Sequence, residues 1–146
     1  MTHPAAHPPT VRLGAVLLLQ KGDKILLGKR RSSFADGRYM FMGGHVEHKE
    51  PVKKCLAREI KEEIGISIAE KDMTPVHILH VLADYEAVWV VLKATKWKGS
   101  PRNLEPEKCS DLGWFPINRL PRESGPHVKE IMRELAKGRF FSEQRH

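Results

Sequence analysis

The chain has 146 residues, enough for one domain with a full hydrophobic core and too few for two ordinary domains. Its hydrophobic fraction of 40% and charged fraction of 29% are typical of a globular protein, and the sequence lacks the run of about 18 apolar residues that a membrane span requires. The net charge of +7 favours an anionic partner, such as a nucleotide, a nucleic acid or a membrane surface.

The first residues predict neither a signal peptide nor ordered structure. Segment 1–10 (MTHPAAHPPT) has no positively charged start and no apolar centre, so we interpret it as a disordered lead-in. The two cysteines, Cys55 and Cys109, lack a CxxC spacing. They indicate a reduced, cytoplasmic protein in which both thiols are structural.

The first half of the chain predicts a hairpin, a loop and a helix. Apolar runs at 11–19 and 24–31 flank a short turn, and residues 32–41 read as a loop. Pro51 suits the first turn of a helix, where its missing N–H costs nothing. That helix runs to about Ile64, with Gly65 as a left-handed stop.

The second half adds further strands and a second helix. In chain order we predict strands at 77–85 and 86–94, a polar loop at 96–110, a short strand at 111–117, a helix at 127–138 and a loose tail at 139–146. This order predicts an α/β fold with a mixed β-sheet sandwiched between helices. We therefore expect one domain over 11–138, between the lead-in and the tail.

Three acids on the first predicted helix require a physical reason. Glu59, Glu62 and Glu63 fall within five positions, where like charges on a helix repel one another. At about 100° per residue, Glu63 projects between Val52 and Leu56, inside the apolar arc. A carboxylate at the core boundary is costly unless a cation or a metal pairs with it. Clustered carboxylates suit Mg²⁺, and the alternative is an acidic face exposed to water.

The segment around these acids resembles the signature of the Nudix hydrolase family. Every fixed position of that signature is present, namely Gly44, Glu50, Arg58, Glu59, Ile60, Glu62, Glu63, Gly65 and Ile66. The resemblance implies a Nudix fold over residues 11–138. It also implies hydrolysis of a phosphoanhydride bond in a nucleoside diphosphate linked to another group.

The resemblance further implies roles for individual residues. It makes Glu59 and Glu63 ligands of Mg²⁺, with Mn²⁺ as a substitute, and Glu62 either a further ligand or the general base that activates water. The carbonyl of Gly43 adds another implied ligand. Arg58 is implied to hold the carboxylates in their orientation.

Two more features resemble the MutT-like branch of the family, which cleaves nucleoside triphosphates to a monophosphate and pyrophosphate. One is the GGH sequence at 43–45, and the other is NLEPEKCSDLGWF at 103–115. The resemblance suggests oxidised or modified purine nucleotides as substrates. It also suggests that Glu105 or Glu107 reaches the metal site as a catalytic residue.

Basic and polar residues near the signature are predicted to contact the substrate. Arg30 lies at the end of the strand predicted at 24–31. In many Nudix proteins an arginine at the end of this strand faces the phosphates, so we predict that role for Arg30. Arg31 points to the opposite sheet face because strand side chains alternate. Gly44 and His45 join the predicted substrate site through the GGH opening.

Aromatic residues supply candidates for the wall of a base pocket. The irregular loop that carries Phe34 and Tyr39 is the predicted rim of this pocket. Tyr85, Ala87 and Trp89 share one face of a strand. We interpret Trp89 as an ordinary core residue.

Several alternatives stay open. Within the family, the substrate could be ADP-ribose or another nucleotide sugar, a dinucleoside polyphosphate or an RNA 5′ end. A catalytically silent module that only binds nucleotides is the non-enzyme alternative, although such domains usually have broken signatures. We expect a small-molecule nucleotide as partner, with neither a membrane nor a nucleic acid, and either a monomer or a homodimer.

Overall fold

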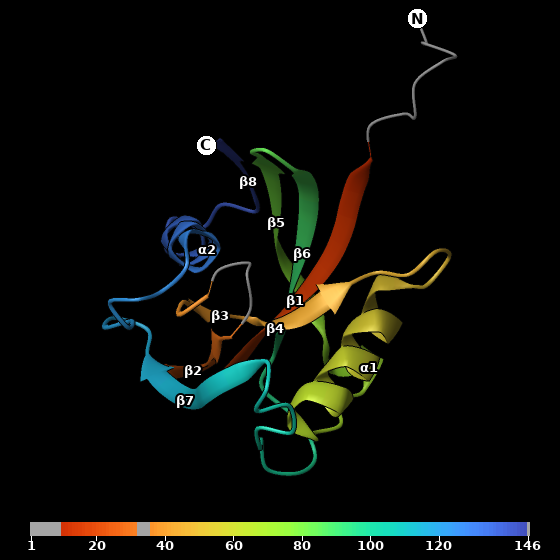
Figure 1. The fold of residues 1–146 in the computed structure, drawn as a ribbon, viewed down its shortest axis with the longest axis vertical. Helices are drawn as coiled ribbons and strands as arrows, with labels where there is room; N and C mark the ends of the chain where they lie inside the picture. Colours follow the sequence, from red (N-terminus) through yellow and green to blue (C-terminus); the bar gives the residue numbers. More distant parts are fainter. Residues whose placement is uncertain (1–9, 32–35, 146) are drawn as a thin grey trace, which may run out of the picture.

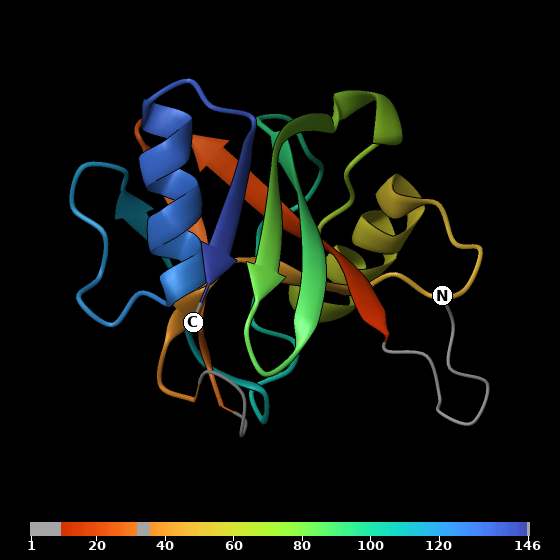
Figure 2. The same ribbon diagram turned by 90° about the horizontal axis from the view of Figure 1, so that it is seen from above.

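A mixed β-sheet lies between two α-helices in the computed structural model, which describes residues 10–31 and 36–145 (Figures 1 and 2). The strands are β1 (Val11–Lys21), β2 (Lys24–Arg30), β3 (Tyr39–Met40), β4 (Met42–His45), β5 (Thr74–Leu82), β6 (Glu86–Ala94), β7 (Cys109–Pro116) and β8 (Phe141–Arg145). The helices are α1 (Val52–Ile64) and α2 (Pro126–Ala136), with a short 3₁₀ turn η1 (Glu70–Asp72). The predicted α/β fold with helices on both sides of a mixed sheet is confirmed.

Strand β1 is the centre of this sheet. The strand order is β3-β2-β1-β6-β5-β8, while β4 also pairs with β1 and β7 with β2. The β1–β6 and β5–β8 pairs are parallel, and the other pairs are antiparallel. Because both faces of β1 are covered by helices, its sequence is apolar at nearly every position from 13 to 19.

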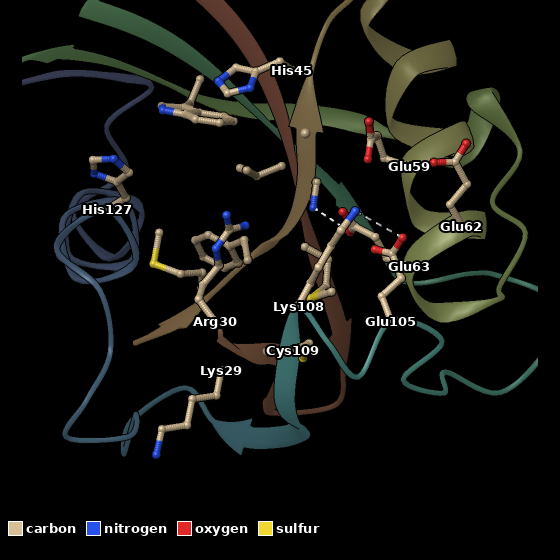
Figure 3. A pocket seen from close by; sticks show the side chains of 18 of the residues that line it. Lys29, Arg30, His45, Glu59, Glu62, Glu63, Glu105, Lys108, Cys109 and His127 are labelled. Atoms are coloured by element: carbon tan, nitrogen blue, oxygen red, sulfur yellow. Dashed lines mark hydrogen bonds and ion pairs between the residues drawn. The ribbon is translucent and has the colours of Figure 1, made fainter. Parts of the chain in front are cut away.

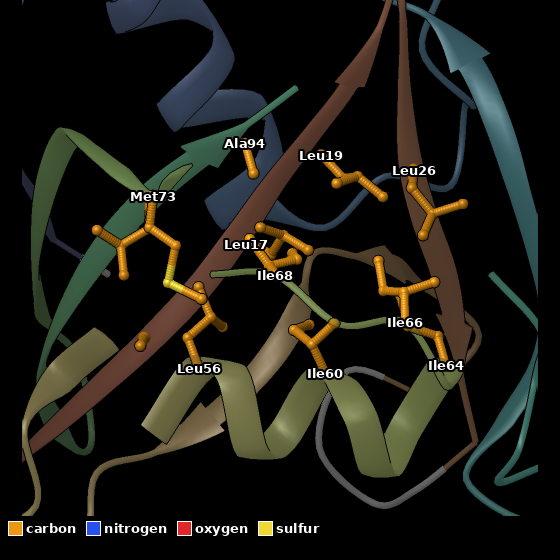
Figure 4. Close-up of a cluster of buried hydrophobic side chains, with 12 residues drawn as sticks. Leu17, Leu19, Leu26, Leu56, Ile60, Ile64, Ile66, Ile68, Met73 and Ala94 are labelled. Carbon is orange, nitrogen blue, oxygen red and sulfur yellow. The ribbon is translucent and has the colours of Figure 1, made fainter. Parts of the chain in front are cut away.

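Helix α1 covers one face of the sheet with the apolar residues that its period predicts. Leu56, Ile60 and Ile64 are fully buried against Leu17 and Leu19 of β1 (Figure 4). Burying each such side chain contributes roughly 1.5–3 kcal/mol. This packing fixes the orientation of α1. The acids lie on the face of the helix next to these apolar residues.

Both ends of α1 follow the prediction. The helix begins after Pro51 and ends at Gly65, whose φ of 74° is left-handed and whose N–H donates to the carbonyl of Lys61. On the opposite face of the sheet, Val128 and Ile131 of α2 pack into a second core. The described part of the chain contains no helix long and apolar enough to cross a membrane.

The chain before α1 contains two strands, where we predicted a loop and no strand. Residues 39–40 form β3, and residues 42–45 form β4, in which Gly43 pairs with Val16. At Gly43 the φ is 155°, and a Cβ atom would lie 2.1 Å from the carbonyl oxygen of Ala15. Only glycine permits this approach, and the same residue type hides the strand, because glycine carries no period-2 pattern.

The C-terminal segment is not the loose tail that we predicted. Residues 141–145 form β8, which runs parallel to β5 at the edge of the sheet. The inward positions of β8 are the polar residues Ser142 and Gln144, whereas Phe141 is exposed. The strand is therefore held by backbone pairing with β5 and by polar side-chain hydrogen bonds, and an apolar pattern could not reveal it. The predicted lead-in falls on residues 1–9, outside the described ranges.

A buried histidine provides a test of β8. The ring of His77 is fully buried, with Nδ1 2.9 Å from the carbonyl oxygen of Arg139 and Nε2 2.8 Å from the hydroxyl of Ser142. Since a carbonyl only accepts, Nδ1–H donates to it and Nε2 accepts from Ser142. Ser142→Ala leaves a buried acceptor without its donor, so we expect the free energy of unfolding to fall by about 1–3 kcal/mol in urea denaturation.

The matched control for this substitution is Arg145→Ala on the same strand. The Arg145 side chain is 76% exposed, and its ion pair with Glu143 is 4.0 Å long. We expect its loss to change the free energy of unfolding by less than about 0.5 kcal/mol. Equal stability of the Ser142→Ala variant and the wild type would contradict the prediction that the buried hydrogen bond of Ser142 stabilises β8.

Candidate active site

A pocket of about 750 Å³ opens between α1 and α2 (Figure 3). Acids of α1 line one end of it, and aromatic residues with His127 of α2 line the other. Figure 3 shows Arg30 between these two ends. The pocket therefore joins the signature helix to side chains that lie far from it in the sequence.

The glycines of β4 bring the backbone close to the acids of α1. The N–H of Gly43 donates to Oε1 of Glu63 over 3.1 Å. A Cβ atom at Gly44 would lie 2.5 Å from the carboxyl carbon of Glu59, so any side chain there would displace that carboxylate. Glu62 also lines the pocket, and its side chain is 56% exposed. All three predicted acids thus border one space.

The two inner acids resist ionisation. Burial raises the pKa of Glu63 from its ordinary value of 4.5 to about 8, and the nearby charges of Glu59 and Glu105 add to this rise. The N–H of Gly43 acts in the opposite direction. Burial also raises the pKa of Glu59. In the absence of a bound cation, the pair therefore retains a proton more readily than free carboxylates do.

Arg58 links two carboxylates on the outer side of this cluster. Its guanidinium forms a two-bond fork with Glu50, at 2.9 and 3.1 Å, and donates a further bond of 3.1 Å to Glu59. The fork holds the pKa of Glu50 down to about 2. Arg58 thus fixes one oxygen of Glu59, which is the geometry that an orienting role requires.

The loop before β7 docks onto the end of α1. The N–H of Leu104 donates to the carbonyl of Glu63, and the Asn103 side chain bridges the loop through bonds to the Cys109 carbonyl and the Glu105 N–H. This arrangement brings Glu105 to the pocket wall. Glu107 lies in an exposed turn and is not one of the lining residues. Of the two candidate acids in this loop, Glu105 borders the site.

The chemistry of this acid cluster fits a hard divalent cation. The donors are carboxylate oxygens, and the half-buried Glu63 faces two further negative charges. Across residues 10–31 and 36–145, no three side chains of His, Cys, Asp or Glu already converge as ligands. Glu59 and Glu63 would therefore supply two of the ligands, and oxygens from the backbone or water would complete the shell of the ion.

Basic side chains lie opposite the acids. Pairing of β2 with β7 is irregular between Lys29 and Arg30, and such irregularities redirect a side chain. Arg30 points into the pocket, whereas Lys29 is directed away at its edge (Figure 3). The charge of Arg30 reaches both Glu63 and His45, since it lowers the pKa of each. Arg31 is exposed and does not line the pocket.

The far end of the pocket is aromatic. Trp89 lies against Gly14, where a Cβ atom would come within 2.2 Å of the indole, and its ring centroid is 5.2 Å from that of His45. Trp89 lines the pocket as well as packing against the second core, so our interpretation of it as an ordinary core residue is incomplete. Its Nε1–H is the only buried side-chain nitrogen or oxygen in the described ranges without a hydrogen-bond partner.

Two rim residues also need comment. Tyr39 is buried in the second core and donates a hydrogen bond of 2.6 Å to Asp111, so it does not form the rim that we predicted. Phe34, a predicted substrate contact, lies outside the described residues. His127 was not predicted, and it meets Tyr85, one of the aromatic candidates for the base pocket, in the pocket wall over 2.9 Å. They lie 42 positions apart, and no local pattern links them.

Comparison with known proteins supplies further findings. The family model described as NUDIX domain matches residues 8–135. The crystal structure of a MutT NUDIX hydrolase from Burkholderia pseudomallei superimposes with a TM-score of 0.81 and 28% identity, covering 86% of this chain and 98% of that one. A MutT protein from Bacillus halodurans superimposes with a TM-score of 0.77 and 19% identity, covering 93% and 90%, which shows a shared fold.

The curated proteins with similar sequences carry a different description from the similar structures. The NAD-capped RNA hydrolase NudC of Stutzerimonas stutzeri is 31% identical over 115 residues, which cover 79% of this chain and 40% of that protein. The chain thus matches about two fifths of the length of this curated relative. Two further relatives, from Pseudomonas entomophila and Pseudomonas putida, are 24% identical over 113 residues and carry the same description.

The raised pKa of Glu63 predicts how stability depends on pH in metal-free protein. Between about pH 4.5 and 8 the folded state keeps this proton and the unfolded state loses it. The free energy of unfolding should therefore fall as pH rises through this window, by up to about 1.4 kcal/mol per pH unit. Urea denaturation in EDTA at a series of pH values measures this slope.

Two variants separate Glu63 from the other titrating groups. Glu63→Gln should flatten the decline, because the amide has no proton to lose. Glu62→Gln should retain it, since the Glu62 side chain is mostly exposed. A slope that survives in Glu63→Gln would assign the proton to another group.

Proposed function

Because the chain belongs to the Nudix hydrolase family, we propose that it is a metal-dependent pyrophosphohydrolase that cleaves nucleoside triphosphates to a monophosphate and pyrophosphate. Family membership and the Nudix fold confirm the resemblance predicted from the signature. The finer proposal concerns the substrate, and it extends to oxidised or modified purine nucleotides.

One observation carries the proposal, namely the order of groups along the pocket. Carboxylates of Glu59 and Glu63 stand at one end, Arg30 stands between, and Trp89 and His45 form an aromatic end. A nucleoside triphosphate has the same order, with a polyanion at one end and a flat base at the other. Aromatic faces stack on bases, and an arginine fork suits phosphate oxygens.

At the acidic end we assign the metal to Glu59 and Glu63, with the Gly43 carbonyl as a further ligand. Mg²⁺ bound there would neutralise phosphate charge and lower the pKa of a bound water, and Mn²⁺ would serve as a substitute. Glu62 and Glu105 border the same space and are the two candidates to accept the proton of the attacking water. Glu105 replaces Glu107 in this proposal, because Glu107 is turned to solvent.

His45 has a different role from Arg30 in this scheme. Burial, with the charges of Arg12 and Arg30, lowers the pKa of His45 below 6.5. This shift favours the neutral form of the ring. We assign it to stacking with Trp89 and the substrate, and we assign charge recognition of the phosphates to Arg30.

A second candidate function is hydrolysis of the pyrophosphate that joins two nucleosides, as in NAD or an NAD-type RNA cap. The identity of 31% to a NudC protein favours it. The same acidic end would act on the central pyrophosphate, and the aromatic end would hold one of the two bases. The two candidates differ in the group that leaves, so product analysis separates them.

A substrate panel tests the proposal. The panel contains the four dNTPs, the NTPs, oxidised dGTP, ADP-ribose, diadenosine polyphosphates, NAD and NAD-capped RNA, each with Mg²⁺ or Mn²⁺. We expect the highest kcat/KM for a triphosphate, with pyrophosphate as a product and a kcat lower by at least about 100-fold in Glu63→Gln. Higher turnover of NAD or NAD-capped RNA would favour the second candidate, and higher turnover of ADP-ribose would contradict both.

The neighbours Arg30 and Arg31 test how the phosphates are recognised. A charge-assisted hydrogen bond from Arg30 is worth about 1.5–3 kcal/mol, so Arg30→Ala should lower kcat/KM by about 10- to 150-fold, mainly through KM. Arg30→Lys should recover only part of this, because an ammonium lacks the planar fork. Arg31→Ala should change kcat/KM less than about threefold, since Arg31 does not line the pocket.

Both alanine variants remove one positive charge, so the comparison is made in one buffer at one salt concentration. Equal losses in the two variants would indicate general attraction by the basic surface. A larger loss at Arg31 would mean that the end of β2 presents the other side chain to the substrate.

A further inference from the structure

A chain of hydrogen bonds runs from the C-terminal strand β8 into the aromatic end of the pocket. The Gln144 side chain meets Nδ1 of His127 through its Oε1 at 2.7 Å. On the other side of the ring, Nε2 of His127 lies 2.9 Å from the hydroxyl of Tyr85. Tyr85 and His127 both line the pocket, whereas Gln144 does not.

The donor and the acceptor in each of these hydrogen bonds can be assigned by starting from Gln144. The amide nitrogen of Gln144 donates to the carbonyl of Pro126 over 3.1 Å, and a carbonyl has no proton to offer. The amide oxygen of Gln144 therefore faces His127 and accepts from Nδ1–H. In the neutral ring the other nitrogen, Nε2, is then an acceptor, so the Tyr85 hydroxyl donates to it.

This order determines what Tyr85 offers to a ligand. A phenol has one proton, and here the bond to His127 uses it. A ligand group that meets the Tyr85 oxygen must therefore donate, as the N–H groups of a nucleobase edge do. Trp89, which lies 6.5 Å from His127 between ring centroids, provides the stacking surface beside it.

We propose that Gln144 is a positioning residue for nucleoside binding: through His127 it sets the direction of the Tyr85 hydroxyl, so that the pocket wall presents an acceptor to the base. The inference rests on the proposed function, in which the base occupies this end. It gives β8 a part in substrate affinity, although this strand lies outside the pocket.

Two substitutions of similar length separate polarity from packing. Gln144→Met removes both bonds of the amide and leaves the ring free to change its tautomer. Gln144→Glu keeps an acceptor beside Nδ1 but adds a carboxylate, which stabilises the doubly protonated ring. Both ring nitrogens then donate, so the Tyr85 oxygen accepts and its proton turns away from His127. Glu143→Gln, an exposed neighbour on β8, is the control.

The kinetic readout is the split between KM and kcat. Gln144→Glu should raise KM for the preferred triphosphate by about 5- to 30-fold and change kcat less than about twofold, because the acidic end is untouched. Gln144→Met should raise KM less than Gln144→Glu does. The inhibition constant of inorganic tripolyphosphate, which has no base, should change less than about twofold in both variants.

The second readout does not depend on activity. In ¹⁵N-labelled protein, the neutral His127 ring should carry its proton on Nδ1 in the wild type, and the doubly protonated ring should persist to higher pH in Gln144→Glu, with the His127 signals identified by their loss in His127→Gln. A wild-type ring protonated on Nε2 alone would overturn the inference.

The kinetic outcomes distinguish the inference from the function on which it rests. If the wild type hydrolyses triphosphates and Gln144→Glu matches Glu143→Gln in KM, the positioning role is overturned. An equal rise in KM for Gln144→Met and Gln144→Glu, or a matching rise for tripolyphosphate, would also overturn it, since packing or charge would then explain the effect. If the wild type hydrolyses no triphosphate, the proposed function fails, while the ring spectrum still decides the hydrogen-bond order.

Discussion

The half-buried carboxylate of Glu63 is the constraint on which the pocket depends. Its position follows from the apolar stripe of α1, which turns this face of the helix toward the sheet. Burial and the charge of Glu59 make the ionised form costly, and a single backbone N–H from Gly43 offsets only part of that cost. A cation would satisfy both acids together. Under the proposed function, the stability lost by burying these two carboxylates would favour the binding of a positive ion.

The helices were predictable because their information is local. The period of α1 and its stop at Gly65 both lie within fifteen consecutive positions, and each was confirmed. Strands β4 and β8 were missed for a common reason, which is that neither is held by an apolar pattern. Close backbone approach at Gly43 fixes the first, and side-chain hydrogen bonds of Ser142 and Gln144 hold the second. Period-based reasoning detects apolar burial, so it misses such strands.

The site, too, has one part that a local sequence pattern predicts and one part that it does not. Apart from Glu105, its acidic end is built from Gly43 to Glu63, a stretch short enough for a spacing pattern to describe, and the structure brings these residues together at one space. The aromatic end combines His45, Trp89 and His127, which come from three separate elements. Their meeting depends on the sheet order and on the absence of a side chain at Gly14. No spacing rule contains that information, and this is why Trp89 was interpreted as core.

This division explains why the signature predicts a reaction more readily than a substrate. Cleavage of a phosphoanhydride needs carboxylates, a cation and a water, and one helix with its preceding strand can arrange all three. Recognition of a base needs donors and acceptors at the distance of the nucleoside from the cleaved bond, and the next elements of the fold must supply them. Under the proposed function they come from Tyr85, just before β6, from His127 of α2 and, through Gln144, from β8. Substitutions in these elements can change the preferred base while the acidic end stays intact, so proteins with the same signature can differ in substrate.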